Sequence, residues 1–106
     1  MGLLFQDWGL TTVDALTQAR SVLNAHADRT TLISSGGMRS GIDMAKSLAL
    51  GAHMCGVAAP LLSAAQESKD AVIDRIDRLH REFKTALFLL GCADCSALIG
   101  NDALVQ

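Results

Sequence analysis

Tyrosine is absent from this chain of 106 residues, which holds one Trp, three Phe and a single Pro. Aromatic residues make up 4% of the sequence, although half of it is hydrophobic. A core must therefore be built from Ala, Leu, Ile, Val and Met, and a chain of this length allows one small domain. The mean hydropathy of +0.30 is high for so short a chain, which indicates apolar surfaces meant for something larger than the chain itself.

Long apolar runs, a disulfide framework and a basic patch are missing as well. The longest apolar run, residues 54–62, is far below the roughly 20 residues of a membrane-spanning helix, and three cysteines are an odd number. The nine basic and eleven acidic side chains are interspersed, unlike the concentrated basic surface that nucleic acid needs. The first five residues lack the basic region of a secretory signal. We therefore expect a cytoplasmic protein with no membrane or nucleic-acid partner.

The periodicity of the chain predicts an alternation of helices and strands. Expected helices cover residues 13–25 (capped by Thr11 or Thr12), 42–50, 61–65 and 69–90, with one more short helix in the tail after residue 91. Expected strands cover residues 30–34 and 53–58, the second closed by Pro60. This order is typical of α/β proteins with parallel strands and right-handed crossovers. Two strands alone do not make a stable parallel sheet, so the chain is predicted to be a piece of an open or closed α/β sheet.

The turn after the first expected strand has the composition of a phosphate-binding loop. It runs Ser35-Gly36-Gly37-Met38-Arg39-Ser40-Gly41 and leads directly into a helix. Glycines let the main chain approach an anion and adopt positive φ, while Arg39 adds a charge-assisted contact. A strand, a tight turn and a helix N-terminus together hold phosphate through backbone N–H groups. The alternative is a plain turn in which the glycines relieve crowding.

A second turn of small residues, Gly56-Val57-Ala58-Ala59-Pro60, follows the second expected strand. In (β/α)8 barrels a phosphate site often uses the loops after strands seven and eight together with a short extra helix. We therefore expect the backbone N–H groups of both turns to share one anion. The alternative is that this second turn is only a packed corner.

The other reactive side chains do not form a recognisable site. Cys92 and Cys95 make a CxxC, but redox pairs of this kind follow a strand at a helix N-terminus, whereas this pair follows the end of the long helix, so we expect a structural role. His26, His53 and His80 are scattered and have no nucleophile nearby in the sequence. We assign no catalytic and no metal-binding residue, and the charged face of the long helix indicates solvated i,i+3 and i,i+4 pairs.

Four segments resemble the type 2 isopentenyl-diphosphate isomerases. They are Trp8-Gly9-Leu10-Thr11-Thr12, residues 35–52, residues 56–60 and residues 83–91. The resemblance covers residues 5–98 and only the final third of a family member. FMN-dependent α-hydroxy-acid oxidases also carry Gly-Gly-x-Arg, so the Trp-Gly segment decides between the two families.

The resemblance implies a fold and a cofactor. Those isomerases are (β/α)8 TIM barrels that bind FMN, use it reduced, require Mg²⁺ and NADPH, and interconvert isopentenyl and dimethylallyl diphosphate. By order, residues 1–106 would be a single partial domain, the C-terminal part of such a barrel: helix, strand seven, helix, strand eight and last helix. The FMN phosphate would bind at these residues: Gly36, Gly37, Met38, Arg39, Ala58 and Ala59.

Departures from the family pattern limit what the chain is expected to do alone. Thr11 replaces a usual Pro, Leu90 a usual Thr, and Cys92 and Cys95 are atypical. The resemblance implies that the family's substrate-binding and Mg²⁺-binding residues lie in earlier strands and that its NADPH site is not in this chain, so we expect no activity from this chain by itself. The predicted function is an FMN-phosphate-binding fragment of an isomerase, either a truncated gene product or one piece of a split barrel that a chain carrying the N-terminal strands would complete. The alternatives are a self-associating, non-catalytic remnant or a fragment of an α-hydroxy-acid oxidase.

Overall fold

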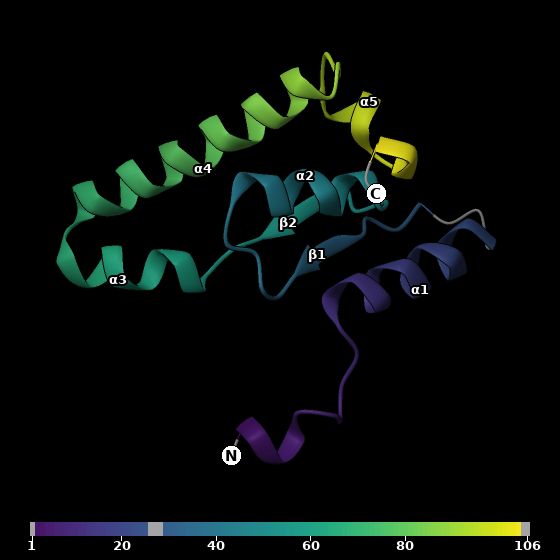
Figure 1. Cartoon of the computed structure of the whole chain (residues 1–106), viewed down its shortest axis with the longest axis horizontal. Coiled ribbons are helices and arrows are strands. Elements are labelled where there is room, and N and C mark those ends of the chain that lie inside the picture. The colour runs from purple at the N-terminus through teal and green to yellow at the C-terminus, as the bar shows by residue number, and fades with distance from the viewer. Residues whose placement is uncertain (1, 26–28, 105–106) are drawn as a thin grey trace.

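The computed structural model describes residues 2–25 and 29–104, and His26 lies outside them. Two short 3-10 turns, Gly2–Phe5 and Asp102–Leu104, flank the regular elements. These elements are, in chain order, α1 (Thr12–Ala25), β1 (Ile33–Ser35), α2 (Gly41–Ala49), β2 (Met54–Gly56), α3 (Ala59–Glu67), α4 (Lys69–Leu89) and α5 (Cys95–Leu98). Figure 1 shows the long helix α4 running beside α2 and α3, and the N-terminal segment projecting away from the other elements.

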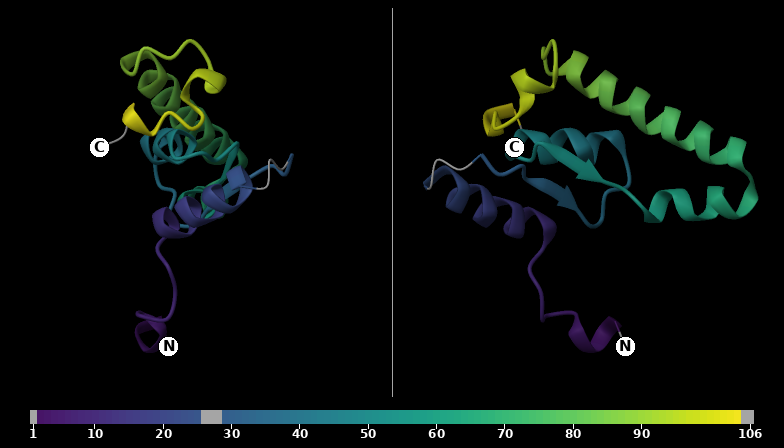
Figure 2. Two further views of the ribbon diagram at one scale, coloured as in Figure 1. Left: turned by 90° about the vertical axis from the view of Figure 1, so that its right-hand side faces the viewer. Right: turned by 180° about the vertical axis from the view of Figure 1, so that it is seen from behind.

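The strands β1 and β2 pair in parallel, joined by α2. Ile33 lies opposite Met54 and Ser35 opposite Gly56, and within the described ranges the sheet has these two strands alone. The predicted α/β class is therefore confirmed, with α1 and α2 beside a small parallel sheet that does not close on itself (Figure 2).

Local sequence signals account for the boundaries of α2. The Ser40 hydroxyl accepts a hydrogen bond from the N–H of Asp43, while the Asp43 carboxylate accepts from the N–H of Ser40, which makes a capping box. Gly51, with φ of +117°, follows the helix end. The buried faces of α2 and α5 form the main core, against which α4 packs: Ala45, Leu48, Ala49 and Leu98. Alanines on α2 allow the close approach of α4 that the core requires.

Several expected boundaries were wrong by one to three residues. Each strand is three residues long, shorter than expected, because among the described residues the parallel pairing extends only from Ile33 opposite Met54 to Ser35 opposite Gly56. Before β1, the N–H of Leu32 donates to Nδ1 of His53 at 2.9 Å instead of to a strand backbone. Pro60 does not close a strand but sits in the first turn of α3, where its missing N–H would have had no helical partner anyway.

Helix α2 covers one face of the sheet, and the other face is exposed. Ser34 and Cys55 face α2: the Ser34 hydroxyl lies 3.5 Å from the Ser47 hydroxyl, and Cys55 Sγ lies 3.7 Å from the carbonyl oxygen of Met44. Ile33 and Met54 point to the other face and are 58% and 57% exposed. Parallel sheets normally have both faces buried, so this apolar pair marks an uncovered face. None of the helices in residues 2–25 and 29–104 is long and apolar enough to cross a bilayer.

Candidate functional site

The two predicted turns line one hollow of about 240 Å³ at the C-terminal ends of β1 and β2. All six residues expected to bind the cofactor line it, together with Ser35 and Gly56: Gly36, Gly37, Met38, Arg39, Ala58 and Ala59. Parallel strands bring their C-terminal ends to the same edge of the sheet, which explains why turns about 20 residues apart meet. Their role as phosphate ligands stays a prediction from the sequence.

Positive φ angles at two glycines shape the first turn. Gly36 has φ of +98° and Gly37 has φ of +73°, a conformation that residues with a Cβ rarely adopt. The carbonyl oxygen of Gly36 accepts a hydrogen bond from Thr12 Oγ1 at 2.9 Å, which ties the turn to the start of α1. No other atom lies within 4 Å of where a Cβ of Gly37 would be, so the chain presents bare backbone there.

Met38 is nearly buried, with 6% of its surface exposed. Its sulfur accepts a hydrogen bond from the Ser47 hydroxyl on α2 at 3.5 Å. The side chain therefore anchors the turn on α2, and Met38 has only its backbone to offer to an anion.

The N–H groups of Arg39, Ser40 and Gly41, where the turn enters α2, are already bound by groups of the chain itself. The Asp43 carboxylate accepts from the N–H groups of Arg39 at 3.0 Å and Ser40 at 3.2 Å, and Glu82 Oε2 on α4 accepts from Gly41 N–H at 2.9 Å. These three N–H groups are therefore not free for the anion that the sequence predicts at the start of α2. Because the N–H of Arg39 is bound, only its exposed side chain could contact an anion.

The start of α3 is different. Ala58 is its N-cap and has no side chain that could accept a hydrogen bond, whereas Ser40 caps α2 and Ser68 caps α4. Within the described part of the chain, no acceptor binds the N–H groups of Gly37, Met38, Ala58 and Ala59. The residues that carry these four donors line the hollow at the start of α3, where the helix dipole is positive, and none of the lining residues is acidic.

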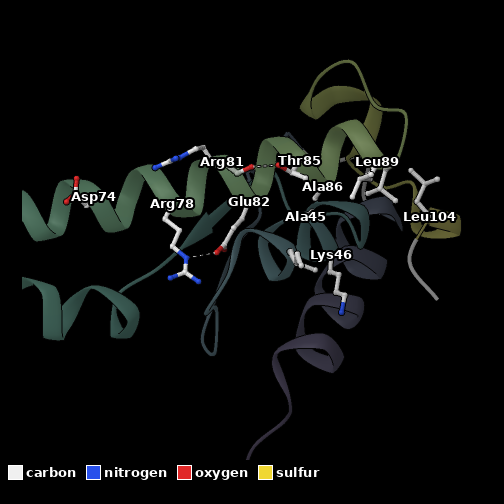
Figure 3. Close-up of a pocket in the computed structure, with 12 residues that line it drawn as sticks. Ala45, Lys46, Asp74, Arg78, Arg81, Glu82, Thr85, Ala86, Leu89 and Leu104 are labelled. Carbon is white, nitrogen blue, oxygen red and sulfur yellow. Dashed lines mark hydrogen bonds and ion pairs between the residues drawn. The ribbon is translucent and has the colours of Figure 1, made fainter.

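Glu82 is the residue near this site that the sequence did not single out. Hydrogen bonding to Gly41 N–H is the main cause that lowers the pKa of its carboxyl, and Arg78, whose Nε lies 3.1 Å from Glu82 Oε1, lowers it further. Figure 3 shows this ion pair beside a wider groove between α2 and α4, about 820 Å³ in volume. The local pattern placed Arg78 and its neighbours on a solvated face, and no short-range signal links Glu82 to a residue 41 positions earlier.

The three cysteines are free thiols in different surroundings. Burial raises the pKa of the Cys55 thiol, and a hydrogen bond with Ser47 partly offsets that effect. Cys92 is half-buried and Cys95 is exposed, both as free thiols. Across residues 2–25 and 29–104, no three His, Cys, Asp or Glu side chains are grouped in a way that would hold a metal ion.

Comparison with known proteins identifies the class to which this site belongs. The sequence model of the FMN-dependent dehydrogenase family matches residues 6–106, so the chain belongs to that family. Within it, the chain is similar to isopentenyl-diphosphate delta-isomerases, which confirms the resemblance found in the sequence. It is 58% identical over all 106 residues to the enzyme of Paracoccus zeaxanthinifaciens and 50% identical over 105 residues to that of Hydrogenovibrio crunogenus. The chain covers 30% and 29% of these two proteins, so it spans about three tenths of the length of the curated relatives it matches.

Proposed function

We propose that this chain is the FMN-phosphate-binding part of an isopentenyl-diphosphate isomerase. The observation that carries the proposal is the convergence of two strand-end turns on one hollow, with four backbone N–H groups that have no other acceptor among the described residues. A phosphate dianion fits this donor set, because the hollow has no acidic lining residue and Arg39 lies at its edge. When bound, FMN supplies the reduced flavin ring that the isomerase family uses.

Each residue of the site has a distinct task in this proposal. Gly37 lets the main chain approach the phosphate without a Cβ between them, and Met38 fixes the turn from below through its contact with Ser47. Ala58 and Ala59 present the uncapped start of α3, whose dipole favours an anion. The Arg39 guanidinium adds a positive charge from the solvent side.

The surrounding fold supports placement in a (β/α)8 barrel. The order of α1, β1, α2, β2 and α4 agrees with the helix after strand six, strand seven, its helix, strand eight and the last helix, and α3 agrees with the short extra helix of barrel phosphate sites. The uncovered Ile33 and Met54 then face the barrel interior. The rest of the barrel would supply the substrate-binding residues and the Mg²⁺ and NADPH sites, so the chain alone would hold the cofactor phosphate without catalysis.

A titration with two flavins tests the proposal. The full chain is titrated with FMN and with riboflavin, which lacks the phosphate, and quenching of flavin fluorescence is followed. We expect saturable binding of FMN with a Kd below about 1 mM, an affinity worth about 4 kcal/mol, and much weaker binding of riboflavin. No saturation with FMN at this concentration, or equal affinity for the two flavins, would refute a phosphate site.

A second candidate function is self-association without a cofactor. Large apolar side chains are exposed on the N-terminal segment and at the end of α4, among them Trp8 and Phe88, and such patches mark interaction surfaces. This candidate predicts concentration-dependent oligomers in sedimentation velocity together with no FMN binding. For both candidate functions, the sequence identity of 58% and 50% to isopentenyl-diphosphate isomerases favours an origin from an isomerase over an origin from an α-hydroxy-acid oxidase.

A further inference from the structure

The long helix α4 contacts the phosphate loop at two points on either side of Ser40. Arg75 Nη2 donates to the carbonyl oxygen of Arg39 at 3.5 Å, and Glu82 Oε2 accepts from Gly41 N–H at 2.9 Å. Arg75 and Glu82 are seven residues apart, which places them on the same face of the helix. One helix face therefore binds both peptide groups through which the loop enters α2.

The backbone of α4 is also unusually close to the start of α2. A Cβ added to Gly41 would lie 2.6 Å from the carbonyl oxygen of Leu79 and would clash with the backbone nitrogen of Phe83. The third glycine of the loop is thus explained by the crossing of two helices. Because the two helices are in close backbone contact at this crossing, the position of α4 sets the position of Gly41.

The bonds of the loop divide it into a held part and an open part. Gly36 is tied to α1 through Thr12, and residues 39–41 are tied to Asp43, Arg75 and Glu82. Between these anchors, the N–H groups of Gly37 and Met38 have no acceptor among the residues that the structure describes. A glycine-rich segment held at both ends loses less conformational freedom when it binds a ligand.

We propose that Arg75 and Glu82 are positioning residues of the phosphate site: they hold the exit of the loop so that the amides of Gly37 and Met38 are pre-ordered for an anion. This role rests on the proposed function, because the anion is the FMN phosphate. Neither side chain lines the hollow, so both act through the loop backbone. Arg78 in turn orients Glu82 through the ion pair of 3.1 Å shown in Figure 3.

Substitutions on α4 in the full chain test this role, with two readouts. Amide hydrogen exchange of residues 37–41 is measured without ligand, and the FMN Kd is measured by fluorescence quenching. We expect Glu82→Ala to speed exchange at Gly41 at least tenfold and to weaken FMN binding about tenfold, since a hydrogen bond to a charged group is lost. Arg75→Ala should also speed amide exchange in the loop and weaken FMN binding, each by a smaller factor. Glu82→Gln keeps an oxygen that accepts from Gly41 N–H and should stay within about twofold of the wild type.

Exposed residues of the same helix provide matched controls. Asp77→Ala and Arg81→Ala remove the same charges from α4, and the side chains of Asp77 and Arg81 contact no other group of the described chain through a hydrogen bond or ion pair. The proposal is overturned if Glu82→Ala changes loop exchange and FMN affinity no more than Asp77→Ala does, or if Glu82→Gln is as impaired as Glu82→Ala. If Glu82→Ala does not fold, as judged by circular dichroism, the same two measurements are compared between Arg75→Ala and Arg81→Ala. Equal effects of these two substitutions then overturn the proposal. A wild-type chain that binds no FMN refutes the proposed function, whereas the ligand-free exchange still decides whether α4 orders the loop.

Discussion

The guanidinium of Arg20 on α1 donates to the carbonyl oxygen of Gly100 at 2.9 Å and so joins positions eighty residues apart. It also donates to the carbonyl oxygen of Leu50 at 3.2 Å and lies 3.4 Å from the Asp102 carboxylate. Gly51 makes room for this arrangement, because a Cβ there would lie 2.5 Å from Cδ of Arg20. One side chain thus caps the end of α2 and fixes both α1 and the C-terminal turn to it.

Replacing Arg20 with methionine should destabilise the fold. The substitution keeps much of the apolar stem but leaves two carbonyl oxygens without their charged donor, which should lower the free energy of unfolding by about 2 kcal/mol. Chemical denaturation followed by circular dichroism measures the change. Arg29→Met removes the same charge from an exposed position and should be neutral within about 0.5 kcal/mol. Equal effects of the two substitutions would contradict the anchoring role of Arg20.

Two glycines with the same backbone conformation separate strain from binding. Gly37 has φ of +73° and Gly91 has φ of +72°, and in both cases the space for a Cβ is open. Gly37→Ala and Gly91→Ala should therefore each lower stability by about 1–2 kcal/mol. Only Gly37→Ala should also weaken FMN binding, about tenfold or more, because in the proposed site its Cβ would stand between the main chain and the phosphate.

Thermal melting and FMN titration of both variants check this expectation. If Gly91→Ala weakens FMN binding as much as Gly37→Ala, the effect reflects general loss of stability. In that case the hollow between the two turns is not the binding site.

The elements of the fold could be predicted from the sequence because their signals are local. Ser40 and Asp43 are three residues apart and together indicate the start of α2. Gly51 and Gly91 each indicate the end of a helix. The meeting of the two strand-end turns followed from one general rule, that parallel strands end at the same edge. The candidate site is built largely from these local features, so most of its residues could be named in advance.

Contacts across long sequence separations could not be predicted. The charged face of α4 has the pattern of solvated ion pairs. Nothing in its spacing distinguishes Glu82, which accepts from Gly41 N–H, from Asp77, for which the described residues provide no such partner. Arg20 similarly appears in the sequence as one more charge on an amphipathic helix. These side chains acquire their roles only when helix crossings bring carbonyl and amide groups within reach, which depends on the packing of the whole chain.

Acid should destabilise the chain partly through Glu82. Its carboxyl accepts from Gly41 N–H and faces Arg75 and Arg78, and these contacts lower its pKa in the folded state below the ordinary value of 4.5. The unfolded chain therefore takes up this proton first as the pH falls. The stabilisation is complete above the ordinary pKa and is lost as the pH falls through the lower value of the folded state.

Melting temperatures between pH 6 and pH 2.5 measure this contribution. Other carboxylates titrate in the same range, so the informative quantity is the difference between the wild type and Glu82→Gln. We expect the wild type to lose more stability on acidification than this variant does. Parallel curves for the wild type and Glu82→Gln would show that Glu82 gives no pH-dependent stability.

The uncovered sheet face should be an association surface, whether its partner is the rest of a barrel or a second copy of the chain. Ile33 and Met54 lie opposite each other there and are more than half exposed, and burying such side chains is worth about 1.5–3 kcal/mol each. Ile33→Lys should leave the melting temperature of the isolated chain nearly unchanged and should abolish oligomers seen in sedimentation velocity. Val22→Lys, at 57% exposure on α1, adds the same charge elsewhere and should leave association intact. Equal loss of association in both variants would mean that added charge, and not this face, governs assembly.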